Sequence, residues 1–146
     1  MKKIYGLYNA LNMKLGWLPA LLTRITLAQV FLESGWGKLH HLDKVIAFFQ
    51  SLGIPAPQLQ APFVAGTELV GGVLILIGLA TRPASIMVGA TMMVALLTTK
   101  RADIGSFSDL TGMIEYLYLV LFAWLIIKGA GRCSVDALLA KKLEEN

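Results

Sequence analysis

The stretch APFVAGTELVGGVLILIGL, residues 61–79, has only one charged side chain, Glu68. A helix that crosses a membrane needs about 20 predominantly apolar residues, so this stretch predicts a span. The glutamate shares one helix face with Ala61, Ala65 and Gly72, because the steps between these four residues are four, three and four positions. Small residues let a neighbouring helix approach closely, so we expect Glu68 to point into a helix contact and not toward lipid.

The composition of the whole chain indicates a membrane protein. Of its 146 residues, 56% are hydrophobic and 15% are charged, and the mean hydropathy is +0.67. These values exceed what a soluble domain of this length needs. With about 20 residues per span, the length allows roughly four spans with short connections and no separate soluble domain. We therefore expect residues 1–146 to form a single membrane-embedded domain.

The fold class that we predict is all-α, a bundle of four transmembrane helices. The predicted spans cover about residues 19–38, 61–79, 83–99 and 113–128. Two amphipathic segments, about residues 3–15 and 42–52, are too short to span, and we expect them to form short interfacial helices at the N-terminus and between the first two spans. The turn after the second span is tight, so the second and third spans should be antiparallel neighbours, with Thr81 capping the third.

Three glutamates lie inside these apolar stretches: Glu33, Glu68 and Glu115. A charged side chain near the centre of a membrane helix costs about 3 kcal/mol, so such residues normally face a bundle interior, a partner or a water-filled cavity. If consecutive spans cross the membrane in opposite directions, all three glutamates lie very roughly 5 to 10 Å below the outer hydrocarbon boundary. Glu115 also has a structural explanation, since an acidic residue in the first turn complements the helix dipole. We expect a ligand or proton site centred on Glu68, with Glu33 and Glu115 contributing and Lys38 as an ion-pair partner for Glu33.

Basic residues determine the predicted orientation. Eight Lys and Arg residues fall on the side of the two termini and four on the other side. Because cytoplasmic loops carry the excess of basic residues, both termini are predicted to be cytoplasmic in a multi-pass protein of the inner (plasma) membrane. Arg24, Arg82 and Arg132 are expected to anchor at lipid headgroups, Arg24 by snorkelling from one turn inside the first span. No basic face is clustered enough to bind nucleic acid.

The sequence contains no pattern with catalytic specificity. Cys133 is the single cysteine, which excludes an intrachain disulfide or a CxxC redox pair. Adjacent histidines such as His40 and His41 diverge on a helix, so we predict no metal site. We also predict no catalytic residue, and we favour an accessory subunit over a stand-alone enzyme.

A series of short segments carries a family resemblance through its order along the chain. The segments are Arg24, residues 35–38, Phe49 with Gly53 and Pro55, residues 68–72, residues 78–82, residues 115–116 and residues 131–136. Together they resemble the DoxX family of small four-helix integral membrane proteins. The chain departs from the family pattern at Pro83, which follows Thr81 and Arg82, and in the loop before Glu115.

The resemblance implies a redox-associated membrane protein, because the family is named for a subunit of a thiosulfate:quinone oxidoreductase. We therefore expect an inner-membrane accessory subunit whose glutamates and Lys38 form a pocket for a quinone headgroup or for a partner's redox centre. Two alternatives stay open, a small proton-coupled transporter that uses Glu68 and a purely structural or assembly protein with neutral glutamates. The expected partners are membrane lipid, a membrane or soluble oxidoreductase, and a second copy of the chain.

Overall fold

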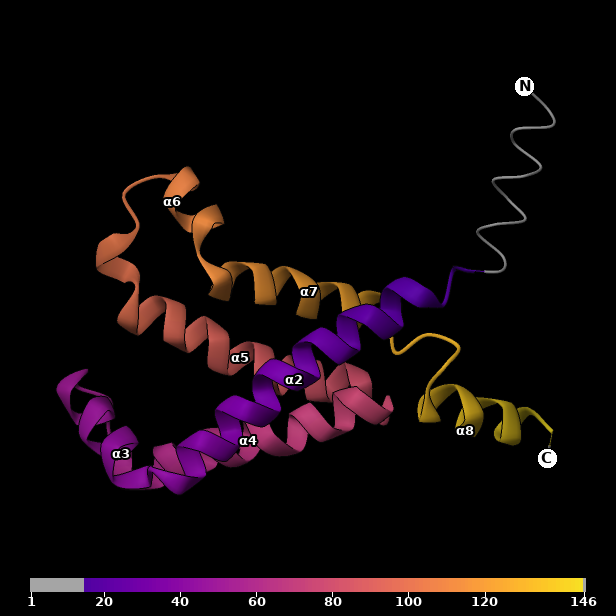
Figure 1. The fold of residues 1–146 in the computed structure, drawn as a ribbon, viewed down its shortest axis with the longest axis horizontal. Coiled ribbons are helices and arrows are strands. Elements are labelled where there is room, and N and C mark those ends of the chain that lie inside the picture. Colours follow the sequence, from indigo (N-terminus) through magenta and orange to yellow (C-terminus); the bar gives the residue numbers. More distant parts are fainter. Residues whose placement is uncertain (1–14, 146) are drawn as a thin grey trace.

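The computed structural model describes residues 15–145, which are helical with no strand (Figure 1). Their elements are α2 (Leu18–His40), α3 (Leu42–Ser51), α4 (Pro57–Ile77), α5 (Thr81–Thr99), the 3-10 helix η1 (Arg101–Asp103), α6 (Phe107–Gly112), α7 (Ile114–Lys128) and α8 (Val135–Glu144). The all-α prediction is confirmed. The interfacial helix predicted at about residues 3–15 lies, except for its last residue, outside the described residues.

Two of these helices, α4 and α5, are long and apolar enough to cross a membrane. The longer helix α2 has 23 residues, but Arg24, Glu33 and Lys38 lower its hydropathy. The helix α7 has 15 residues, about 22 Å of helix, which is shorter than the roughly 30 Å hydrocarbon core of a bilayer. By length and composition, the described residues therefore contain two candidate spans where we predicted four.

The long helices pack as two pairs, α2 against α4 and α5 against α7, and α4 contacts α5 between the pairs (Figure 1). The buried core comprises Leu27, Phe31, Ile75, Ala84, Val88, Met92, Phe122 and Leu125. Phe31 of α2 meets two aromatic rings of α7, with ring centroids 5.2 Å from Phe122 and 5.6 Å from Tyr118. These aromatic contacts join the two helix pairs.

The contact between α2 and α4 depends on small residues. A Cβ added to Gly35 would lie 2.6 Å from the backbone nitrogen of Leu69 and 2.8 Å from the carbonyl oxygen of Ala65. The face of α4 that we predicted from spacing is buried along its length, including Glu68. The prediction that Glu68 points into a helix contact is confirmed.

The outward faces of three long helices are strongly apolar. On α7, exposed residues recur every three or four positions: Ile114, Leu117, Val120, Trp124 and Ile127. The exposed residues in the middle of α4 and α5 include Val70, Val73, Ile86 and Met93. Soluble monomers rarely expose so much contiguous apolar surface, so these faces need an apolar environment or a partner.

Two short helices were not predicted. The helix α6 lies in the polar loop before α7, where Ser106 and Asp109 form a capping box. The helix α8 follows Ser134, whose hydroxyl accepts a hydrogen bond from the Ala137 nitrogen at 3.2 Å. In Figure 1, α8 lies at the opposite end of the molecule from α3 and α6.

Candidate functional site

A cavity of about 640 Å³ opens between α3, α4 and α5, beside the end of α2. Its apolar lining includes Val45, Phe48 and Phe49 of α3, Leu52 just after that helix, Phe63 and Val64 of α4, and Met87, Met92 and Val94 of α5. The charged side chains on its wall are Lys38, Lys44 and Glu68. The cavity is therefore a mostly apolar space with three charged side chains on its wall.

Glu68 is held by two side chains from α2. Lys38 Nζ lies 2.5 Å from both carboxylate oxygens, and Ser34 Oγ donates a hydrogen bond to Oε2 at 2.8 Å. Ser34 and Lys38 are four residues apart, so they lie on one face of α2 and reach the same carboxylate. The Glu68 side chain is 1% exposed and that of Lys38 is 27% exposed. The buried carboxylate is thus both paired and hydrogen-bonded, which is the usual condition for an interior charge.

This arrangement leaves hydrogen-bonding capacity on the cavity wall. The ammonium of Lys38 has three donors, and the carboxylate oxygens accept two of them. Thr91 and Thr98 donate to carbonyls of their own helix, Val88 and Val94, each at 2.7 Å, so their hydroxyl oxygens still have acceptor capacity. A molecule with an apolar body and a polar acceptor group matches this lining.

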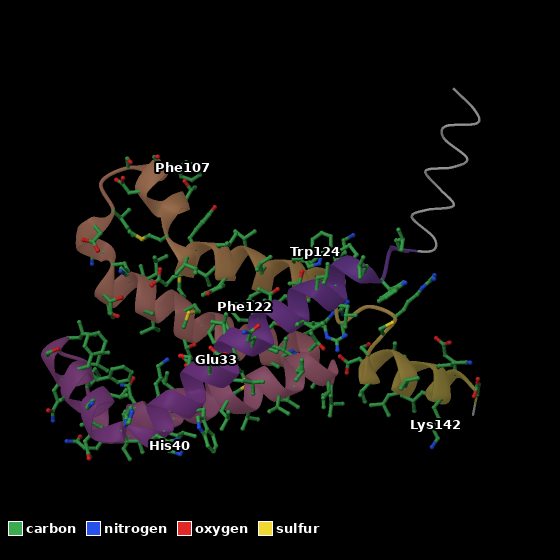
Figure 2. All side chains as sticks on the ribbon, viewed as in Figure 1. Glu33, His40, Phe107, Phe122, Trp124 and Lys142 are labelled. Carbon is green, nitrogen blue, oxygen red and sulfur yellow. The ribbon has the colours of Figure 1, made fainter. Side chains whose placement is uncertain are left out.

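The structure brings together some of the predicted site residues and separates others. Lys38 pairs with Glu68 and not with Glu33, because residues five apart on a helix point about 140° away from each other. Glu33 is exposed on α2 (Figure 2), and Glu115 is half-buried in the first turn of α7. Neither lines the cavity. Sequence reasoning missed Ser34, although its spacing from Lys38 was available as a signal.

The prediction that Arg24 anchors at lipid headgroups is wrong. The residue surface of Arg24 is 2% exposed, and the guanidinium donates to four backbone carbonyls instead of snorkelling outward. The acceptors are Ile75 at 2.8 Å, Leu76 at 2.6 Å, Ala130 at 3.0 Å and Cys133 at 2.6 Å. The carbonyls in the last turn of a helix lack intrahelical partners and carry negative partial charge, so they bind a cation well. Arg82 and Arg132, in contrast, are exposed near α8.

Asp136, which lies at the same end as Arg24, has a structural role that sequence reasoning missed. Its carboxylate accepts hydrogen bonds from the backbone nitrogens of Ala80 at 2.7 Å and Thr81 at 3.0 Å. It therefore caps α5 in place of Thr81, whose hydroxyl has no hydrogen-bond partner among the described residues. Gly78, at φ +73°, lies so close to the Arg24 guanidinium that an added Cβ would be 2.7 Å from Arg24 Cζ. Only glycine fits at this position. Arg24, residues 78–82 and residues 131–136 thus form one connected structural unit.

The described part of the chain offers no group of three or more His, Cys, Asp or Glu side chains that could hold a metal ion. The comparison with protein families finds a match over residues 20–101 to the family model described as DoxX. The chain belongs to the DoxX family. The predicted family membership is confirmed, and every residue that lines the cavity falls inside the matched range.

Several curated proteins are similar to this DoxX protein over most of their length. "Putative oxidoreductase CatD" of Bacillus subtilis (strain 168) is 31% identical over 123 residues, which are 83% of this chain and 87% of CatD. "Inner membrane protein YqjF" of Escherichia coli (strain K12) is 32% identical over 130 residues, 88% of this chain and 98% of YqjF. "Inner membrane protein YphA" of the same organism is 30% identical over 127 residues, 80% of this chain and 86% of YphA. No solved structure matches this DoxX protein significantly.

Proposed function

We propose that this DoxX family membrane protein is an accessory component of a redox system and that its cavity binds the headgroup of a quinone. The observation that carries the proposal is the Lys38–Glu68 pair on the wall of a mostly apolar cavity. A quinone has a flat apolar ring with carbonyl acceptors. The third donor of Lys38 suits a carbonyl oxygen, while Phe48, Phe49 and Met87 offer aromatic and polarizable contacts to the ring.

Two further observations support this assignment. A cavity of about 640 Å³ lies within the roughly 300–1,000 Å³ typical of small-molecule sites. One relative, CatD, bears the name of an oxidoreductase. Because the described site has no catalytic constellation of its own, the redox chemistry is assigned to a membrane or soluble oxidoreductase that this protein assists.

We infer four membrane spans, α2, α4, α5 and α7, in one membrane-embedded domain. Support comes from the apolar outward faces of α4, α5 and α7 and from the inward placement of Arg24 and Lys38 on α2. The excess of basic residues on the side of the termini favours cytoplasmic termini in the inner membrane. The names of YqjF and YphA are consistent with that location.

The test measures how much quinone the full-length protein retains in nanodiscs loaded with menaquinone or ubiquinone. The informative variant is the double change Lys38→Met with Glu68→Gln, which removes both charges together and leaves no unpaired buried carboxylate. Lys100→Met is the matched control, since Lys100 does not line the cavity. We expect retention to fall about tenfold in the double variant, as for a lost hydrogen bond to a charged group, and to be unchanged in the control.

Equal retention by the double variant and the wild type would refute quinone binding at this pair. The transporter alternative predicts a different result. In that case Glu68→Gln would abolish proton-coupled uptake in liposomes while quinone retention stayed at the wild-type level. Normal assembly with neither effect would favour the structural role.

A further inference from the structure

The outward face of α2 differs from the outward faces of α4, α5 and α7. The exposed side chains in the middle of those three helices are apolar, as described above. In the middle of α2, the exposed residues include Thr26, Gln29 and Glu33. Polar groups that face lipid hydrocarbon have no hydrogen-bond partners there, and each unsatisfied group costs free energy. This face of α2 therefore calls for a protein partner within the membrane.

None of these three side chains has a hydrogen bond or ion pair within residues 15–145. Gln29 lies 11 residues from each end of α2, about 16 Å along the helix, which is its centre. Glu33 lies about 10 Å from the C-terminal end of the helix. Both side chains are thus too deep for their polar ends to reach the headgroups easily.

The polar residues belong to a longer row of exposed residues along α2, which we call the α2 seam. It comprises Leu22, Thr26, Gln29, Glu33, Trp36 and His40, at steps of four, three, four, three and four positions. Figure 2 labels Glu33 and His40 on this helix. Alternating steps of three and four are the a and d spacing of helices that pack side by side. The α2 seam therefore has the pattern of a helix-pairing interface.

We propose that the α2 seam is the interface with a second copy of this chain, the two α2 helices packing in parallel about a twofold axis along the membrane normal. In such a pair each seam residue faces its own counterpart. This inference rests on the proposed membrane span of α2.

The chemistry of the α2 seam is complementary to itself. The Gln29 amide has both donors and an acceptor, so two copies can hydrogen-bond to each other reciprocally, and the Thr26 hydroxyls can do the same. A second copy thus provides hydrogen-bond partners for Thr26 and Gln29 at the centre of α2.

The test is disulfide cross-linking of single-cysteine variants of the full-length protein in inner-membrane vesicles. The native thiol is first removed by Cys133→Ser, because Cys133 is exposed. Single cysteines are then introduced into the α2 seam as Thr26→Cys, Gln29→Cys and Glu33→Cys. The control is Val70→Cys, on the apolar face of α4. We expect oxidation to produce a covalent dimer from the three seam variants and none from the control.

Three results would overturn the proposal. The first is the absence of dimer from every seam variant. The second is an equal yield from Val70→Cys, which would indicate random collision. The third is cross-linking of the α2 seam to a different protein, which would assign this face to another chain. Labelling with a membrane-impermeant maleimide distinguishes an error in the proposed dimer from an error in the proposed membrane span of α2. Labelling of Gln29→Cys from the aqueous phase would refute the α2 span, whereas protection without cross-linking would refute the dimer alone.

A second measurement tests the hydrogen bonds of the α2 seam directly. Gln29→Ala should weaken dimerisation in detergent by about tenfold, because reciprocal hydrogen bonds between helices are lost. Gln58→Ala removes a glutamine that is also exposed, near the start of α4, and should leave the dimer unchanged. Equal dimerisation constants for the two variants would contradict the role assigned to Gln29.

Discussion

Replacement of Arg24 by methionine should destabilise the protein severely, because this buried side chain joins parts of the chain that are distant in sequence. The guanidinium donates to the last turn of α4 through Ile75 and Leu76 and to the segment before α8 through Ala130 and Cys133. Methionine has a similar length and an apolar end. The change therefore removes the hydrogen bonds while it largely preserves the packing volume.

The magnitude follows from the four hydrogen bonds. At roughly 1.5 kcal/mol for each bond from a charged donor, their sum is about 6 kcal/mol. Methionine carries no charge, so the variant no longer has the free-energy cost of burying the guanidinium, and this offsets part of the loss. We therefore expect the free energy of unfolding to fall by about 3–4 kcal/mol. Arg24→Lys keeps the charge but has only three donors and no planar fork, so we expect a smaller loss of about 2 kcal/mol.

The assay is reversible unfolding of the purified protein in mixed micelles, followed by circular dichroism. Arg82→Met is the matched control, because Arg82 lies at the same end, is exposed, and makes one long hydrogen bond of 3.4 Å to the Ile127 carbonyl. The control should change stability by less than about 1 kcal/mol. If Arg24→Met were as stable as Arg82→Met, the structural role assigned to the buried guanidinium would be wrong.

Two further predictions concern helix packing and pH. Gly35→Ala should cost about 1–3 kcal/mol in unfolding free energy, since its Cβ would lie 2.6 Å from the Leu69 nitrogen and push α2 from α4. Gly37→Ala, with nothing within 4 Å, should be neutral or slightly stabilising, and equal losses in the two variants would contradict the close packing. Hydrogen bonds from the Ser106 hydroxyl and backbone lower the pKa of Asp109, so the capping box of α6 is fully stabilising above the ordinary aspartate pKa and weakens as pH falls through the lowered value. Ser106→Ala should raise the pKa of Asp109 in a carboxyl NMR titration, and an unchanged midpoint would oppose this assignment.

Much of the helical layout could be predicted because it depends on local pattern. Runs of apolar residues between Pro, Gly and basic positions marked the helices now seen as α2, α4, α5 and α7, and a short amphipathic run marked α3. The burial of Glu68 was also predictable, since a period of 3.6 residues places it on one face with small residues. In contrast, α6 and α8 are short helices in polar segments, where hydrophobic periodicity is weak.

The partners of charged side chains could not be predicted in the same way. Lys38 is near Glu33 in sequence, yet it pairs with Glu68 of another helix because only Glu68 lies on the side of α2 that Lys38 faces. Arg24 has a stem long enough to snorkel, yet it is buried because the end of α4 and the segment before α8 place four carbonyl acceptors around it. Both the pairing of Lys38 and the burial of Arg24 therefore depend on where other segments of the chain lie in the folded protein.

By itself, the sequence determined that the chain is an all-α membrane protein of the DoxX family, with a carboxylate committed to a helix contact. Tertiary structure alone decided that Lys38 and Ser34 hold this carboxylate at the edge of an apolar cavity, and that Glu33 remains on the outside of α2. The physical reason is the range of the interactions. Hydrophobic periodicity is encoded within one helix, whereas an ion pair needs two atoms within about 4 Å, and the crossing of the two helices determines that distance.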